Sequence, residues 1–129
     1  MVIDTSAIIA ILLAEPEASA FTKAIERDAA RLLSAVSFLE TSIVIEARRG
    51  AEGLVRLDLL VAEAQFQVVP FSLEDARAAR RAYRLFGKGQ HTAALNFGDC
   101  VSYALARETG EPLLFKGNDF GRTDILPVM

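Results

Sequence analysis

The 129-residue sequence has one cysteine, one histidine and no apolar run that approaches the roughly 20 residues of a membrane-spanning helix. The single Cys100 cannot form an internal disulfide, which fits a reducing compartment, and we expect it to pack as a small apolar residue. The apolar start lacks a basic leader, so no secretion signal is expected. These absences predict a soluble, cytoplasmic protein without a membrane segment.

An excess of positive charge is also missing. Lys and Arg number 14 against 17 Asp and Glu, which gives a net charge of -3. This balance excludes a simple basic nucleic-acid binder, so any contact with nucleic acid must be local or assisted by a metal. The hydrophobic content of 52% is high for a small domain, and we expect a partner to cover part of the apolar surface.

Short apolar runs alternate with helical patterns along the chain. Strands are expected from the start to Asp4 and over 31–34, 66–69 and 113–115, with a further edge strand over 125–128. Helices are expected over 6–14, 16–28, 37–64 with a break near Gly50 and Gly53, 72–86 and 96–110. This alternation predicts one α/β domain over 1–129, with a parallel sheet covered by helices on both faces.

Four acids are placed to meet at one edge of that sheet. Asp4 ends the first expected strand, and Glu40 lies in the first turn of the helix that follows the second strand. Asp99 opens the last long helix, and Asp119 follows the strand over 113–115. Clustered carboxylates repel one another, so such a cluster implies a cation, and all-oxygen ligands favour Mg²⁺ or Mn²⁺ over zinc. A metal of this kind activates water beside a phosphate, which predicts phosphodiester hydrolysis.

Three of these acids also have a structural explanation. Glu40 completes a capping-box pattern with Ser37, Asp99 lies three residues after the candidate cap Asn96, and Asp119 suits a turn. The end of a strand offers Asp4 no such role. From the residues alone, both interpretations stay open for the other three acids.

A stretch without acids extends from residue 76 to residue 98. Within it, basic residues recur at spacings of three and four along one expected helical face. They are Arg77, Arg80, Arg81, Arg84 and Lys88. The pattern is compatible with a face that follows a phosphate backbone, and equally with a solvated helix surface.

The order of these motifs resembles the PIN-domain ribonucleases that act as VapC-type toxins of bacterial toxin–antitoxin pairs. The resemblance is carried by residues 2–7, by 37–40 with Glu46 and Arg48, by 96–104 and by 113–120. Each motif is weak by itself, but their order and spacing are specific and span nearly the whole chain.

The resemblance implies a PIN-like three-layer sandwich with a mostly parallel sheet of four to five strands. It further implies that Asp4, Glu40, Asp99 and Asp119 hold Mg²⁺ or Mn²⁺, with the Ser6 hydroxyl beside them. Asn118 stands where many relatives carry another Asp, which makes Asp119 the better candidate. RNA as substrate, bound by the basic residues above, a small cognate antitoxin and a homodimer are implied as well.

Two other functions remain to be compared. A phosphatase of the haloacid-dehalogenase type also begins with a strand that ends in Asp, with Asp4 as nucleophile, but it needs a second Asp where this chain has Ser6. A non-catalytic interaction module would use the acids only as caps. Stabilisation by Mg²⁺ or Mn²⁺ is expected for either enzyme and not for the interaction module.

Overall fold

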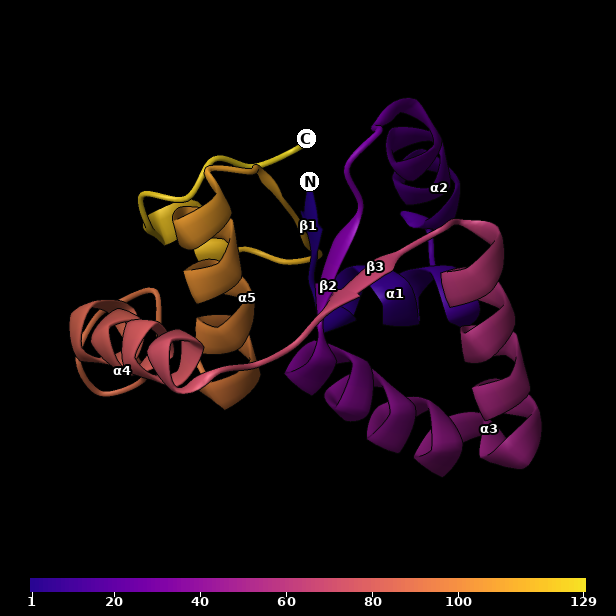
Figure 1. Ribbon diagram of the computed structural model, residues 1–129, viewed down its shortest axis with the longest axis horizontal. Coiled ribbons are helices and arrows are strands. Elements are labelled where there is room, and N and C mark those ends of the chain that lie inside the picture. The colour runs from indigo at the N-terminus through magenta and orange to yellow at the C-terminus, as the bar shows by residue number, and fades with distance from the viewer.

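Four short parallel strands form the centre of the fold, and helices cover both faces of the sheet (Figure 1). In this computed structural model, which describes residues 1–129, the strand order is β3-β2-β1-β4. The strands are β1 (Val2–Ile3), β2 (Leu32–Ser34), β3 (Gln67–Val69) and β4 (Leu113–Leu114). The predicted α/β class and parallel sheet are confirmed.

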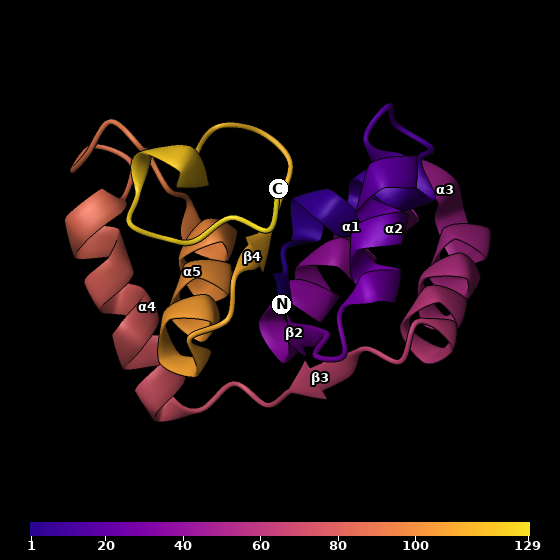
Figure 2. The same cartoon turned by 90° about the horizontal axis from the view of Figure 1, so that it is seen from above.

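The helices lie in two layers (Figure 2). One face carries α1 (Thr5–Leu12), α2 (Ala18–Arg27) and α3 (Ala35–Glu63), and the other carries α4 (Leu73–Phe86) and α5 (Phe97–Thr109). A short 3-10 turn, η1 (Phe120–Arg122), follows β4. No helix combines the length and the hydropathy that crossing a membrane requires.

Alternation within the strands divides the core between the layers. In β1, Ile3 packs into the cluster beneath α1–α3, whereas Val2 packs into the cluster beneath α4 and α5. In β4, Leu114 and Leu113 divide in the same way. Successive side chains of a strand point to opposite faces, so a strand with helices on both sides must be apolar at every position. This explains why these strands are continuous apolar runs.

Helix α3 bends sharply at Gly50, where the backbone adopts φ 62° and ψ -155° (Figure 1). The predicted break is therefore confirmed. The helix begins earlier than expected, because Ser34 at the end of β2 is its N-cap and accepts a hydrogen bond from the Val36 N–H at 3.2 Å. The predicted capping box of Ser37 and Glu40 is wrong, since Ser37 lies inside the helix and is fully buried.

The C-terminal segment contributes less to the sheet than expected. Residues 125–128 form no strand; a single parallel bridge joins Pro127 to Leu113. The sheet therefore has four strands, at the lower end of the predicted four to five.

The order of the strands reverses at β1. The chain passes from β1 to β2 on one side and returns later to β4 on the other, so β1 lies between them. The backbone N–H of Asp4 donates to the carbonyl of Leu114 at 2.9 Å, which ties the ends of the two strands together. In open α/β sheets, ligands bind at such a reversal of strand order.

Candidate active site

Asp4 is the central acid of the site and is 3% exposed. Its Oδ2 accepts hydrogen bonds from the Ser6 N–H at 3.0 Å and the Ser6 hydroxyl at 2.6 Å. Its Oδ1 accepts from the Ser102 hydroxyl, also at 2.6 Å. Asp4 is thus the N-cap of α1, which corrects the expectation that the strand end gives it no structural role. Three donated hydrogen bonds fix the orientation of its carboxylate.

Ser6 lies beside Asp4, as the resemblance implied. Its hydroxyl donates to Asp4 and accepts from the backbone N–H of Lys116 at 3.0 Å. Lys116 follows β4, and its ammonium group pairs with Glu15 and Glu17. One hydroxyl therefore joins the carboxyl ends of the two neighbouring strands at the position of Asp4.

Asp99 lies in the first turn of α5, where it forms a capping box with Asn96. The pKa of Asp99 is raised from its ordinary 3.8 to about 7, mainly by burial and also by the charges of Asp4, Asp119 and Glu40, although the hydrogen bond from the Asn96 N–H lowers it. The three acids that act on Asp99 are the other members of the predicted cluster. The fold therefore brings all four into one electrostatic neighbourhood.

A second capping box shows that the raised pKa is a property of the site. Asp75 forms the same box with Ser72 at the start of α4. There the hydrogen bond from the Ser72 N–H lowers the pKa of Asp75 below its ordinary value. The same motif thus shifts an acid in opposite directions at two helix starts, and the difference is the burial and the neighbouring acids at Asp99.

Glu40 and Asp119 come from two further elements, α3 and the turn before η1. Glu40 is half-buried in α3, and its carboxylate lies against Gly98 in the first turn of α5. Asp119 is exposed directly before η1. Glu46, farther along α3, is exposed and is not among the charges that act on Asp99. No three His, Cys, Asp or Glu side chains are grouped closely enough to enclose an ion.

A set of buried hydroxyl groups next to Asp4 was not predicted from the sequence. Ser102 is fully buried, and its oxygen lies 3.5 Å from the Ser37 hydroxyl. Thr41 donates to the Ser37 carbonyl at 2.7 Å, and Thr5 donates to the same carbonyl at 3.2 Å. The only signal was small hydroxyl residues at helical spacing within apolar segments. These contacts join α1, α3 and α5 around Asp4.

The predicted basic residues lie on the α4 side of the molecule. Arg77, Arg80, Arg81 and Arg84 are exposed on α4, and Arg77 pairs with Glu74. Lys88 is not on the helical face, because α4 ends at Phe86; it lies in the following loop.

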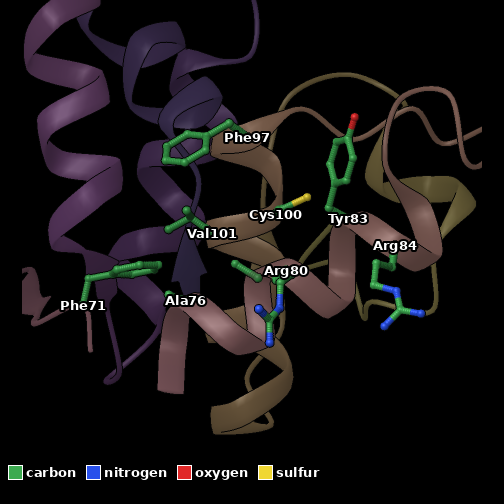
Figure 3. A pocket seen from close by; sticks show the side chains of 9 residues that line it. Phe71, Ala76, Arg80, Tyr83, Arg84, Phe97, Cys100 and Val101 are labelled. Carbon is green, nitrogen blue, oxygen red and sulfur yellow. The ribbon is translucent and has the colours of Figure 1, made fainter. Parts of the chain in front are cut away.

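A groove of about 400 Å³ lies between α4 and α5 (Figure 3). Its lining is almost wholly apolar and includes Tyr83, Phe97 and Cys100, with Arg80 and Arg84 at its border. Cys100 is buried and unpaired, as expected. Phe97 is 74% exposed, the largest value among the large apolar side chains.

The architecture agrees with a known domain. The family model of the PIN domain matches residues 1–126. The structure of VapC20 from Mycobacterium tuberculosis, described as a toxin that cleaves the sarcin–ricin loop, is similar with a TM-score of 0.79 at 15% identity and covers 97% of this chain and 95% of that one. A toxin–antitoxin complex from Klebsiella pneumoniae gives 0.69 at 17% identity, covering 95% and 92%.

Sequence similarity makes the assignment more specific. Ribonuclease VapC30 of Mycobacterium tuberculosis is 54% identical over 128 residues, which cover 99% of this chain and 98% of the relative. The chain belongs to the VapC ribonucleases, a family of PIN-domain toxins. The resemblance and the ribonuclease class are thereby confirmed, and the phosphatase and interaction-module alternatives are excluded.

Proposed function

We propose that this chain is the toxin of a toxin–antitoxin pair and hydrolyses RNA phosphodiester bonds with Mg²⁺ or Mn²⁺ held by Asp4, Glu40, Asp99 and Asp119. The observation that carries the proposal is the half-buried Asp99, whose pKa is raised to about 7 by burial and by the charges of the other three acids. The free Cys100 agrees with action in the reducing cytoplasm.

The residues present fit such an ion in donor type and in charge. All four donors are carboxylates, the ligands that hard divalent cations prefer, and the nearby hydroxyl groups add further oxygen atoms. Neighbouring carboxylates repel one another without a cation, and the charges of Asp4, Asp119 and Glu40 raise the pKa of Asp99. Binding of an ion would relieve this repulsion.

Each part of the chain has a defined task in this proposal. Ser6 and Ser102 fix the Asp4 carboxylate through three hydrogen bonds, so that it keeps its orientation when a negative phosphate approaches. Glu40 and Asp99 come from opposite helical layers and hold the site between them. A bound divalent ion would supply an activated water and positive charge beside the phosphate oxygens. No covalent enzyme intermediate is needed.

Cleavage of RNA by the purified, antitoxin-free protein is expected to require a divalent ion. Manganese should support cleavage, EDTA should stop it, and excess manganese added after EDTA should restore it, because the water is activated only at the bound ion. Gel analysis of several structured RNAs measures the result. Cleavage that continues in EDTA would contradict the proposed chemistry. An RNA that is not cleaved in the presence of manganese shows only that this RNA is not a target.

We also propose that the basic residues of α4 and Lys88 contact the RNA backbone. Replacing Arg80 and Arg84 together with Gln is expected to weaken RNA binding and to reduce the slope of log K against log salt by roughly two units, about one for each lost phosphate contact. Filter binding in a Glu40→Gln background separates binding from cleavage. The matched control replaces Arg49 and Arg56 of α3. An unchanged salt slope in the Arg80 and Arg84 variant would show that these α4 residues are a solvated surface and do not contact RNA.

Two protein partners are expected. We propose that two copies form a homodimer by inserting Phe97 into the groove between α4 and α5 of the other copy. The exposed Phe97 ring and the apolar groove lie on the same face, which is the self-complementary arrangement that a two-fold interface requires. The cognate antitoxin would cover the exposed pair Leu39 and Ile43, which lie next to Glu40 on α3 and would bring the inhibitor over the acids.

The homodimer predicts a strong effect of one exposed substitution. Phe97→Asp is expected to give a monomer, because a carboxylate cannot be buried in an apolar groove without a partner. Light scattering coupled to gel filtration measures the mass. Val55→Asp is the control, since Val55 is exposed on the distal half of α3 and should leave the dimer intact. An unchanged mass of the Phe97 variant would exclude this interface.

A further inference from the structure

Gly98 occupies an unusual place between two of the site acids. It is the second residue of α5, directly before Asp99, and it is buried. A methyl group at its Cβ position would lie 2.2 Å from Oε2, 2.5 Å from Oε1 and 2.6 Å from Cδ of Glu40. These distances are far inside van der Waals contact. The Glu40 carboxylate therefore occupies the space that any other residue would fill with its side chain.

The backbone gives no other reason for glycine here. Gly98 lies in the regular helical part of α5 and lacks the positive φ seen at Gly50, Gly89, Gly110 and Gly117. Glycine is also among the weakest helix formers, and Ala is the strongest. Glycine at this position is therefore explained by the space that its missing side chain leaves and not by its backbone conformation.

Two other glycines show what a structural close contact looks like. A Cβ at Gly53 would meet the Cβ of Arg49 and the carbonyl of Ile45, and one at Gly87 would meet the carbonyl and ring of Tyr83. Those atoms are fixed by the backbone or by packing. At Gly98 the three nearest atoms all belong to the end of one half-exposed side chain, which can rotate into solvent.

The space at Gly98 also favours a negative group. It lies in the first turn of a helix, where backbone N–H groups lack intrahelical partners and the helix dipole is positive. A carboxylate against this turn is attracted to it, which offsets part of the repulsion from Asp99. Gly98 thus lets α5 attract an acid that belongs to α3.

We propose that Gly98 is a positioning residue whose missing side chain forms a seat that holds the Glu40 carboxylate at the acidic site. The proposal rests on the proposed function, in which Glu40 is one of the metal ligands. It predicts that Gly98→Ala keeps the fold and loses the position of Glu40, because the methyl group displaces a mobile carboxylate and no fixed atom.

Manganese titration calorimetry of four proteins tests the seat: wild type, Gly98→Ala, Glu40→Gln and the double variant. Gly98→Ala is expected to lower manganese affinity about ten- to a hundredfold, the usual effect of losing a residue that orients a ligand. The double variant should bind no more weakly than Glu40→Gln alone, since both changes remove the same ligand. The control is Gly121→Ala, where a Cβ meets no atom within 4 Å, and it should bind like wild type.

The results separate the seat from the metal site itself. Wild-type affinity in Gly98→Ala, or independent losses that multiply in the double variant, would overturn the seat. Wild-type affinity in Glu40→Gln would remove Glu40 from the proposed ligands. A crystal structure of Gly98→Ala then decides the seat alone: the Glu40 carboxylate is expected to have left the first turn of α5, and an unmoved carboxylate overturns the proposal.

Discussion

Glu40→Gln is expected to abolish metal-dependent RNA cleavage and to leave the metal-free protein folded. Ser34 caps α3, so the start of the helix does not depend on Glu40. Glutamine keeps the shape of the side chain but removes its charge, and a neutral amide is a poor ligand for a hard divalent ion. Because Glu40 raises the pKa of Asp99 through its charge, its removal lessens the repulsion in the metal-free site.

Thermal unfolding and cleavage assays measure this result together. The melting temperature of the EDTA-treated variant should equal that of wild type or exceed it, and most of the rise with manganese should be lost. Glu46→Gln is the control, because Glu46 is exposed on the same helix and does not act on Asp99. Normal cleavage by the Glu40 variant would leave a site of three acids, Asp4, Asp99 and Asp119.

Asp99→Asn is expected to remove a pH dependence of stability as well as cleavage. The pKa of Asp99 is about 7 in the folded protein and near 3.8 ordinarily, so between these values the folded state binds more protons than the unfolded state. Stability of the metal-free protein should therefore fall as pH rises from about 4 to about 7 through this group. Asn can still accept the Asn96 N–H, so the cap survives while the pH dependence disappears.

Urea unfolding in EDTA at several pH values tests this prediction. Asp99→Asn should be more stable than wild type at pH 8 and should show a flatter profile below it. The matched control is Asp75→Asn in the other capping box, where the folded-state pKa is lowered. That carboxylate stabilises the fold above its ordinary pKa, so its removal should have the opposite sign. Parallel profiles for wild type and the Asp99 variant would show that folding does not change the pKa of Asp99.

Much of the fold and site was predictable from local patterns. Strands buried on both faces must be continuous apolar runs, and acids at their carboxyl ends share one edge of a parallel sheet. The four candidate acids were selected in this way, and Asp99 was correctly paired with Asn96 in a capping box. The break at Gly50 was visible because glycine adopts positive φ without steric cost.

Contacts between distant segments were decided only by the tertiary structure. The sequence by itself determined the alternation of strands and helices, the place of Asp4 at the end of β1 and that of Asp99 at the start of α5, whereas Glu40 lies in the second turn of α3 and not at its start. It did not determine that Ser102 orients Asp4 or that Gly98 leaves room for Glu40, because these pairs are 98 and 58 residues apart and meet only when α3 and α5 pack around β1. Periodicity reports which face of an element is buried, whereas the partner of a buried hydroxyl or an empty Cβ position depends on how the elements pack.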